Sequence, residues 1–316
     1  MSDAPFRLLS LDGGGVRGLY SAAFLEHIEQ HSGKRLIDYF DLIVGTSTGA
    51  IIALGLASGM STAEVLHFYQ EQGRHIFADG RGWFGQLFRP KYDNRRLTEA
   101  LKGIFGDQIM NDLQVPVCVA SYELVQGTPR VFKNDHHGEL HWGGSQPIWK
   151  VAAASSAAPL VFPAFQVESQ DSHIDGGIWA NNPIMVGLAE AVRYFDRQID
   201  DVLALSVGTG TKAFRLERSR SAALGWIGWG RDKRIVNAVF DAQSQSAHES
   251  AKLMLPREQY IRIDADLSSP IPLDDFSAAL PLIERGAQAG RRYKNEVEQR
   301  FLTHPRVPSR SMPETL

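Results

Sequence analysis

The 316-residue sequence predicts an α/β fold with a mostly parallel central sheet and helices on both of its faces. Short apolar runs, which are typical of buried strands, alternate along the chain with amphipathic runs, which are typical of helices. Glycine-bearing turns follow several of the apolar runs directly. Hydrophobic residues make up 43% of the chain and charged residues 22%, a balance that excludes disorder as the dominant state.

The first two strand–helix pairs lie close to the amino terminus. Residues Phe6–Leu11 form a short apolar run that is followed at once by glycines, which indicates a strand. Residues Tyr20–Gln30 carry apolar side chains four positions apart, which predicts a helix. A second strand is expected over Asp41–Thr46 and a second helix over Thr48–Ala57.

The later elements continue the alternation. Residues Asp93–Phe105 have an apolar stripe at helical spacing, and Asn94 is the expected cap. Val115–Ala120 is predicted as a third strand. The Asn182-Pro183 step indicates a helix start, because proline is favoured in the first helical turn. Val202–Val207 is the last predicted strand.

Charge and cysteine content narrow the partners and the compartment. The formal net charge is −3, so the chain has no excess of basic residues. Nucleic-acid binding is therefore not predicted. The only cysteine, Cys118, lies in an apolar run, which excludes an internal disulfide and indicates a reducing compartment. Residues Met1–Phe6 have no secretory-signal pattern, so we expect a cytoplasmic protein. Leu42–Ala63 is uncharged and long enough to span a membrane, but its Gly, Ser and Thr content favours strand, turn and helix.

The domain organisation is predicted to be simple. No change of composition separates two domains before the end of the chain. We therefore expect one domain over residues 1–303, with the recognisable motifs within residues 6–210 and a helical, lid-like remainder. Proline and serine are frequent from His304 onward, which predicts a flexible tail over residues 304–316.

The first glycine motif is Asp12–Gly18, between the first strand and the first helix. Gly13, Gly15 and Gly18 fit the dinucleotide-binding pattern, but that pattern expects an acidic residue at the end of the second strand. Asp41 stands at the beginning of that strand instead. A tight turn without a ligand is one alternative. The other is a loop whose backbone N–H groups point together at an anion, such as an oxyanion.

The second motif is Gly45–Gly49, which has Ser47 at its centre. A serine between two near glycines, after an apolar strand and before a helix, is typical of a nucleophile elbow. The glycines allow the strand and the helix to approach closely. The strained turn lifts the Ser47 hydroxyl out of the sheet, and the N–H of Thr48 then lies near the reacting carbonyl as an oxyanion donor.

The third motif is Asp175–Gly177, which alone predicts only a turn. A serine nucleophile needs a base, and the usual chain order is serine, acid, histidine. His248 lies in a polar helix-like run, His304 lies in the tail, and His173 is expected at the surface at a strand end. None has a distinctive setting, so a carboxylate that acts directly on the serine remains an alternative.

Together and in this order, the three motifs resemble the patatin-like phospholipases. The resemblance covers about residues 6–210, and it also rests on Ala153–Pro159, Phe162-Pro163, Asn181–Pro183 and Ser206–Gly210. It implies a patatin-like three-layer α/β/α fold. It also implies a lipid acyl hydrolase that needs no metal and no other cofactor.

The resemblance also implies roles for single residues. It makes Ser47 the nucleophile and Asp175 the general base of a Ser–Asp dyad. The implied oxyanion hole consists of Gly13, Gly14 and Gly15, to which the elbow adds Thr48. The implied supporting residues are Arg17, Gly45, Gly49, Gly176 and Gly177. For Arg17 two roles stay open, a contact to lipid phosphate and a contact to a neighbouring carboxylate.

Within this family, four segments are most similar to the phospholipase effectors of CBASS antiphage systems: Phe6–Asp12, Ile37–Leu42, Phe132-Lys133 and His136-His137. Those effectors are activated by a cyclic dinucleotide, often cyclic GMP-AMP, and then degrade the host membrane. The resemblance implies a membrane phospholipid substrate at the inner face of the cell membrane and a cyclic dinucleotide ligand, and it leaves a homo-oligomer open. The alternatives are a constitutive patatin-type lipase or esterase and a nucleotide-binding scaffold with a vestigial elbow.

Two stretches combine aromatic and basic residues. They are Arg81–Lys91 and Lys212–Arg234, and the second has seven basic against two acidic residues. Trp226 and Trp229 beside these charges suit an anionic bilayer surface, so both stretches are candidates for a lid or a membrane-docking element. The alternative is a pair of solvated loops with partly buried tryptophans. A cyclic-dinucleotide pocket would need the same residue types.

Overall fold

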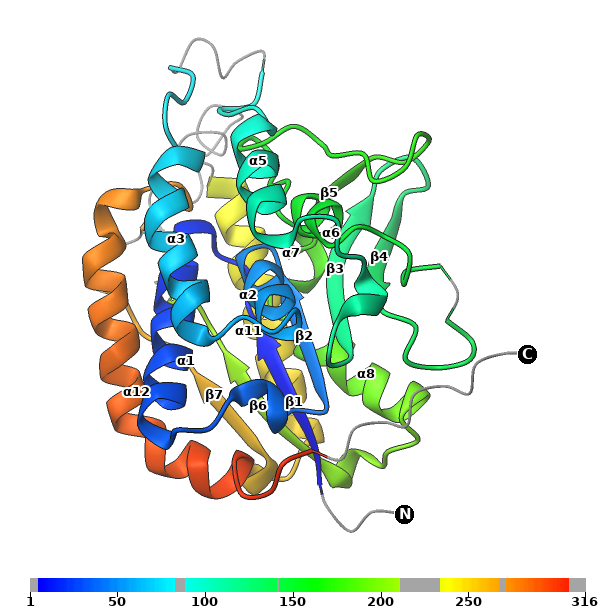
Figure 1. The fold of residues 1–316 in the computed structure, drawn as a ribbon, viewed down its shortest axis with the longest axis vertical. Helices are drawn as coiled ribbons and strands as arrows, with labels where there is room; N and C mark the ends of the chain where they lie inside the picture. Colours follow the sequence, from blue (N-terminus) through cyan, green and yellow to red (C-terminus); the bar gives the residue numbers. More distant parts are fainter. Residues whose placement is uncertain (1–4, 83–88, 141, 211–233, 268–270, 307–316) are drawn as a thin grey trace, which may run out of the picture.

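The computed structural model describes residues 5–82, 89–140, 142–210, 234–267 and 271–306. Its centre is a seven-stranded sheet in the order β4-β3-β2-β1-β6-β7, and β5 pairs with β3 beside this path (Figure 1). The pairs along β3-β2-β1-β6-β7 are parallel, and β4 and β5 are both antiparallel to β3. The predicted α/β fold with a mostly parallel sheet is therefore confirmed.

The strand bounds are β1 Phe6–Leu11, β2 Leu42–Thr46, β3 Val117–Glu123, β4 Thr128–Lys133, β5 His173–Asp175, β6 Val202–Val207 and β7 Tyr260–Ile263. The helices are α1 Gly18–Ser32, α2 Thr48–Ala57, α3 Thr62–Ile76, α5 Arg95–Phe105, α6 Ile148–Ser155, α7 Gly177–Ala180, α8 Ile184–Tyr194, α11 Arg234–Met254 and α12 Ala279–Phe301. The short 3-10 helices are η1 Gly15–Arg17, η2 Leu36–Asp38, η3 Met110–Asp112, η4 Ile199–Asp201, η6 Arg257–Gln259 and η7 Phe276–Ala278.

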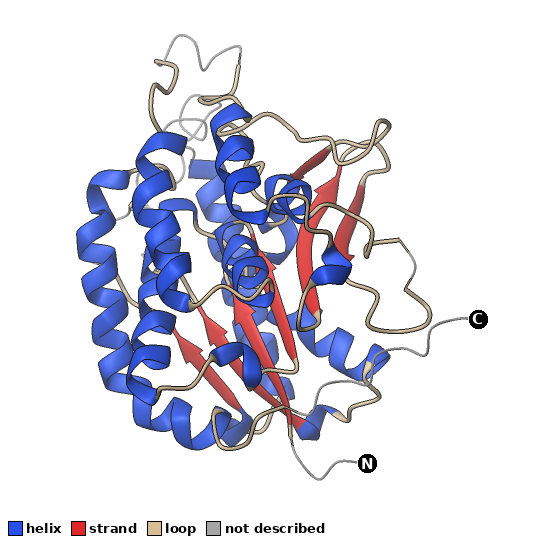
Figure 2. Ribbon diagram, viewed as in Figure 1, coloured by secondary structure: helices blue, strands red, loops and turns tan. Residues whose placement is uncertain are grey.

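Helices cover both faces of the sheet because the strands are apolar on both sides (Figure 2). Leu9 and Ile43 point into the larger core cluster, which also holds side chains of α1, α2, α3 and α12. Leu8 and Val44, one position away, point into the second cluster with α8 and the carboxyl half of α11. This alternation produces the three layers and confirms the predicted α/β/α arrangement.

The predicted boundaries differ from the observed ones where tertiary pairing decides. The third strand begins at Val117 and extends to Glu123, because β4 and β5 pair with its second half. Asn94 precedes α5 as predicted, but its side chain does not cap the helix. The Asn94 carboxamide donates to the carbonyl of Pro163 (3.2 Å), and Asp93 Oδ1 accepts the N–H of Arg95 (3.0 Å).

Part of the segment after residue 303 is attached to the body of the protein. Arg7 Nη1 donates to the carbonyl of His304 (2.5 Å). Arg306 donates its N–H to the carbonyl of Asp38 and its Nη2 to that of Gln114, both at 2.6 Å. These contacts lie at the amino ends of the strands, and residues 307–316 lie outside the described part. The single-domain extent over residues 1–303 stays a prediction.

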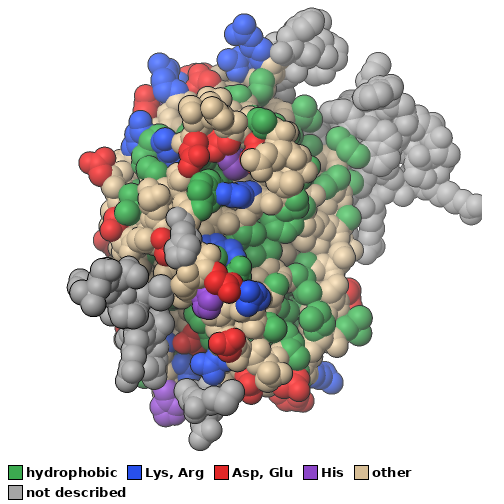
Figure 3. Space-filling model, turned by 90° about the vertical axis from the view of Figure 1, so that its right-hand side faces the viewer, with side chains coloured by type: hydrophobic (Ala, Val, Ile, Leu, Met, Phe, Trp, Pro, Cys, Tyr) green, Lys and Arg blue, Asp and Glu red, His purple; other side chains and the backbone are tan. Residues whose placement is uncertain are grey.

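Side-chain exposure on the face that carries β4 and α8 is mixed. Hydrophobic side chains lie among charged ones there (Figure 3). Exposed hydrophobic residues include Leu124 and Val125 in the turn between β3 and β4 and Val192 on α8. Isolated exposed apolar side chains are common on protein surfaces, so they require no special explanation. Among the described helices, none has a stretch long and apolar enough to cross a membrane. The uncharged run from Leu42 forms β2 and α2 instead.

Candidate active site

The turn between β2 and α2 holds Ser47 in a strained conformation. Its φ of 53° and ψ of −121° lie in a region that non-glycine residues rarely adopt. The turn is tight, since a Cβ on Gly45 would lie 2.7 Å from the backbone nitrogen of Ala50. Ser47 N–H donates to Ser155 Oγ (2.8 Å), and Ser155 Oγ donates to the carbonyl of Ala120 (2.7 Å). The elbow geometry predicted for this motif is present.

Asp175 reaches the elbow because β2 and β5 share one side of β3. β4 occupies the other side of β3. On the shared side, Thr46 of β2 pairs with Ala120, and Asp175 of β5 pairs with the next residue, Ser121. β2 runs parallel to β3 and β5 runs antiparallel to it, so the carboxyl ends of β2 and β5 meet. The residue after β2 is Ser47, and the last residue of β5 is Asp175.

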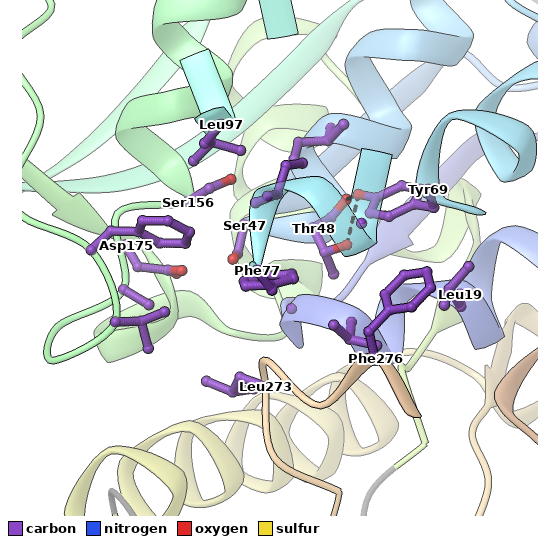
Figure 4. A pocket seen from close by; sticks show the side chains of 18 of the residues that line it. Leu19, Ser47, Thr48, Tyr69, Phe77, Leu97, Ser156, Asp175, Leu273 and Phe276 are labelled. Carbon is purple, nitrogen blue, oxygen red and sulfur yellow. Dashed lines mark hydrogen bonds between the residues drawn. The ribbon is translucent and has the colours of Figure 1, made fainter. Parts of the chain in front are cut away.

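Ser47 and Asp175 line the same cavity, and Figure 4 shows the two side chains directed toward one another. The cavity is narrow, about 60 Å³. Its other lining residues are mainly apolar and include Val16, Leu19, Ile51, Phe68, Ile76, Phe77, Leu97, Val161, Phe162, Phe240, Leu273 and Phe276. A nucleophile-type serine and a carboxylate therefore face an environment that suits hydrocarbon.

The Asp175 carboxylate is fully buried and incompletely hydrogen-bonded. Its Oδ1 accepts the N–H of Gly177 (2.7 Å), and no described residue makes a hydrogen bond to Oδ2. Burial raises the pKa of Asp175 to about 7, against the opposing effects of the Ser47 hydroxyl and the Gly177 N–H. A carboxyl group with a pKa near neutrality is suited to accept a proton from a neighbouring hydroxyl.

The glycine loop after β1 lies next to the elbow, but it does not offer all of its N–H groups. Gly13 donates its N–H to the carbonyl of Asn181 (2.9 Å), so the structure removes Gly13 from the expected set of oxyanion donors. The N–H groups of Gly14, Gly15 and Thr48 have no acceptor among the described residues. Three of the four predicted donors therefore remain available.

Hydrogen bonds to the carbonyls of the same peptide units fix the orientation of two of these N–H groups. Thr209 Oγ1 donates to the carbonyl of Gly13 (3.2 Å), and Arg17 donates N–H (3.1 Å) and Nε (3.3 Å) to the carbonyl of Gly14. In a planar trans peptide the N–H points away from the carbonyl of the same unit. Thr209 thereby orients the N–H of Gly14, and Arg17 orients the N–H of Gly15.

Arg17 is buried, with 7% of its surface exposed, and it is not among the described residues that line the cavity. Burial lowers the pKa of its guanidinium, and the charges of Asp241, Asp264 and Asp12 oppose this effect. Its described hydrogen bonds go to Gly14. In this conformation Arg17 supports the loop from within an acidic surrounding.

An ion cluster around the buried Asp12 holds the base of the same loop. Arg262 donates Nη1 and Nη2 to the two carboxylate oxygens of Asp12 (2.8 and 2.6 Å). The same guanidinium binds Asp264 Oδ2 (2.7 Å) and Ser206 Oγ (2.8 Å). Burial raises the pKa of Asp12 to about 6, and Arg262 opposes the rise. Asp12 precedes Gly13, so this cluster fixes where the loop leaves β1.

None of the three candidate histidines is among the described residues that line the cavity. His173, expected at the surface, is buried instead, because β5 packs against Phe132 (ring centroids 5.2 Å apart). Its Nε2 lies 3.1 Å from an Asp171 carboxylate oxygen. His248 Nδ1 lies 2.9 Å from the Tyr260 hydroxyl, and His304 contacts Arg7 at the opposite edge of the sheet.

The two aromatic-basic stretches are largely outside the described residues. In Arg81–Lys91 the positions 83–88 are not described, and in Lys212–Arg234 only the backbone of Arg234 is. The described ends of the first stretch are paired, since Arg81 donates its N–H to the carbonyl of Lys91 (2.8 Å) and Lys91 Nζ binds Asp274 (2.7 Å). Their predicted lid or docking role stays a prediction.

Sequence reasoning assigned no role to Ser155, Thr209 or Arg262. Ser155 and Thr209 lie in segments that carried the family resemblance, but nothing local indicated that each would hold a backbone group of the site. Arg262 had one signal, a charged residue inside the apolar strand Tyr260–Ile263. A charge at such a position usually needs a buried partner, and Asp12 provides it.

Comparisons with known proteins show the family of this chain. Residues 9–188 match the family model of the patatin-like phospholipases. A cGAMP-activated phospholipase of Vibrio cholerae is 35% identical to this chain, over 89% of each chain. Another cGAMP-activated phospholipase, of Escherichia coli, is 33% identical over 86% of this chain and 84% of its own length. The crystal structure of VipD from Legionella pneumophila gives a TM-score of 0.49 at 15% identity, over 93% of this chain and 67% of that chain.

The chain belongs to the patatin-like phospholipase family. It is accordingly a phospholipase, an enzyme that hydrolyses carboxylic esters of lipids.

Proposed function

We propose that this protein is a phospholipase A-type serine hydrolase that cleaves fatty-acyl esters of membrane glycerophospholipids through a dyad of Ser47 and Asp175. The observation that carries the proposal is the meeting of the strained elbow serine and a buried carboxylate in one apolar cavity. No histidine is among the described residues of that cavity. A hydroxyl and a base within one site are what nucleophilic catalysis requires.

The proposed reaction has two steps. Asp175 takes the proton of the Ser47 hydroxyl while Oγ attacks the ester carbonyl, and the lysophospholipid leaves with that proton. Water then attacks the acyl-enzyme with Asp175 again as base, and the free fatty acid leaves. In both steps the negative charge on the carbonyl oxygen is stabilised by the N–H groups of Gly14, Gly15 and Thr48, aided by the positive end of the α2 helix.

The dyad is tested by substituting each member. Ser47→Ala and Asp175→Asn should each lower kcat on phosphatidylglycerol vesicles by about 10⁴-fold or more, because nucleophile and base act as one unit. Circular dichroism should show that both variants are folded. His173→Ala, His248→Ala and His304→Ala serve as controls. A loss with any of them equal to that of Asp175→Asn would replace the dyad by a histidine-containing triad.

The pH dependence follows from the pKa of Asp175. Burial raises this pKa to about 7, so the carboxyl group is protonated, and cannot act as base, at lower pH. We expect kcat/KM on a water-soluble neutral ester to rise with pH about tenfold per unit below pH 6 and to level off above about pH 7.5. The measurement is an initial-rate profile from pH 4.5 to 9. A flat profile between pH 5 and 8 would contradict Asp175 as the base.

The oxyanion loop is tested through Thr209, which we propose as a positioning residue. Thr209→Val removes the hydroxyl that holds the Gly13 carbonyl and keeps the side-chain size. A misaimed Gly14 N–H should lower kcat by about tenfold to 100-fold with little change in KM, because the lost interaction forms in the transition state. Thr209→Ser keeps the hydroxyl and should restore kcat to within about threefold. Equal losses for the two variants would indicate a packing role only.

We also propose that a cyclic dinucleotide of the cyclic GMP-AMP type activates the enzyme, and that it acts in antiphage defence from the cytoplasm at the inner face of the cell membrane. The support is that two relatives are both named cGAMP-activated phospholipase, and this chain matches 89% and 84% of their lengths. The narrow cavity also supports it. Ligand sites are typically about 300–1,000 Å³, so a cavity of about 60 Å³ needs to widen before a lipid enters.

Activation is tested by titrating cyclic GMP-AMP against hydrolysis of phosphatidylglycerol vesicles. The rate should rise at least tenfold at saturation, because the ligand binds the open or assembled state more tightly. Light scattering on the same samples reports whether a homo-oligomer forms. Full hydrolysis by the enzyme alone, without binding of any cyclic dinucleotide, would instead establish a constitutive patatin-type lipase. Binding without hydrolysis of any ester would establish a scaffold with an inactive elbow.

A further inference from the structure

A second cavity, of about 280 Å³, lies between the end of α3 and the start of α5. We call it the basic cavity, because its lining includes Arg81, Lys91, Arg95 and Arg96 against Asp79 and Asp93. The end of α3 and the start of α5 lie side by side at the top of the molecule in Figure 1. There, Arg96 Nη1 donates to the carbonyl of His75 (3.3 Å). The lining as a whole carries a surplus of positive charge.

Most of these cations have partners among the described residues, and one does not. Arg96 pairs with Asp79 (2.6 Å), and Lys91 pairs with Asp274 (2.7 Å). The guanidinium of Arg95 makes no hydrogen bond or ion pair with any described residue. Arg95 is also the first residue of the 11-residue helix α5, whose amino-terminal dipole adds to the positive potential. Asp93 Oδ1 accepts the backbone N–H of Arg95 (3.0 Å), which leaves the Arg95 guanidinium as the cationic group of this lining without a partner among the described residues.

We propose that the basic cavity binds a phosphodiester anion. A guanidinium presents two parallel N–H donors that match two oxygens of a phosphate, and no described residue uses those of Arg95. The volume suits one phosphodiester together with part of the groups attached to it, whereas the charge makes the cavity unsuitable for an acyl chain. This inference rests on the proposed function, which supplies two sources of a phosphodiester: the head group of a glycerophospholipid and a cyclic dinucleotide.

The basic cavity shares a wall with the catalytic cavity. Ile76 lines both. Tyr92 lines the basic cavity, and its ring centroid lies 5.7 Å from those of Phe77 and Phe162, which line the catalytic cavity. An occupant of the basic cavity therefore contacts the same aromatic wall that limits the space around Ser47.

A second connection runs from the basic cavity to the oxyanion loop. Lys91 Nζ and the Tyr92 hydroxyl both donate to Asp274 Oδ2 (2.7 and 3.2 Å). The preceding residue, Leu273, accepts the N–H of Val16 at its carbonyl (2.8 Å). An anion that attracts Lys91 competes with Asp274, and Asp274 is one residue from the group that holds the glycine loop. Binding in the basic cavity can thus bias the site where hydrolysis occurs.

The test is the charge reversal Arg95→Glu, with Arg257→Glu as the matched control. Arg257 is exposed in η6, at the amino end of β7 and thus at the opposite edge of the sheet. Two quantities are measured on the full-length protein. One is the Kd for cyclic GMP-AMP by calorimetry. The other is the ratio of kcat/KM on phosphatidylglycerol vesicles to kcat/KM on p-nitrophenyl butyrate, which has no phosphate. Circular dichroism verifies folding.

A rise of at least tenfold in Kd with Arg95→Glu alone would identify the dinucleotide as the occupant. A fall of at least tenfold in the substrate ratio, with Kd unchanged, would identify the lipid head group. If both quantities stay within twofold of those of Arg257→Glu, the phosphodiester site is refuted. Failure of the proposed function gives a different result. In that case Ser47→Ala would still cleave both esters, or the wild-type protein would cleave neither. The Kd for cyclic GMP-AMP would still report whether the basic cavity binds the dinucleotide.

Discussion

The site depends on one feature of the sheet, the sharing of one side of β3 by two strands that approach from opposite directions. β2 ends beside Ala120 and β5 ends beside Ser121, so the elbow serine and the buried aspartate meet across one peptide unit. Ser155 secures the junction, since its hydroxyl joins the N–H of Ser47 to the carbonyl of Ala120. The sheet itself therefore maintains the strained backbone conformation of Ser47, which does not depend on a surface loop.

The glycine loop depends on a different kind of constraint, an ion cluster around the buried carboxylate of Asp12. Arg262 lies between Asp12 and Asp264, and a buried charge that loses its partner costs about 3–5 kcal/mol. The loop therefore cannot move away from β1 without exposing or unpairing Asp12. Thr209 and Arg17 donate hydrogen bonds to the carbonyls of the next two residues, Gly13 and Gly14. The ion cluster fixes the position of the loop, and the hydrogen bonds from Thr209 and Arg17 set the direction of its N–H groups.

The sequence predicts the parts of the site better than their assembly. The runs around β1, β2 and β6 are apolar and end in glycines, so periodicity and turn residues suffice to locate them and the elbow. β5 has only three residues and pairs with β3 about fifty positions away, so the sequence indicates a strand end at His173 but neither its pairing with β3 nor the burial of His173. The hydrogen bond that occupies the Gly13 N–H likewise comes from Asn181, far along the chain. The role of Asp175 could be inferred only from family resemblance.

The two cavities indicate where the proposed activation would act. The strained elbow, the carboxylate with its raised pKa and the oriented N–H groups proposed for the chemistry stand together in this structure. Space for a lipid is what the catalytic cavity lacks, at about 60 Å³. An activator that had to build the dyad would need to reorder a sheet. An activator that moves the rings of Phe77, Tyr92 and Phe162 needs only to shift side chains that contact one another. The proposed activation therefore requires a change of access to the cavity, and it does not require the dyad to be rebuilt.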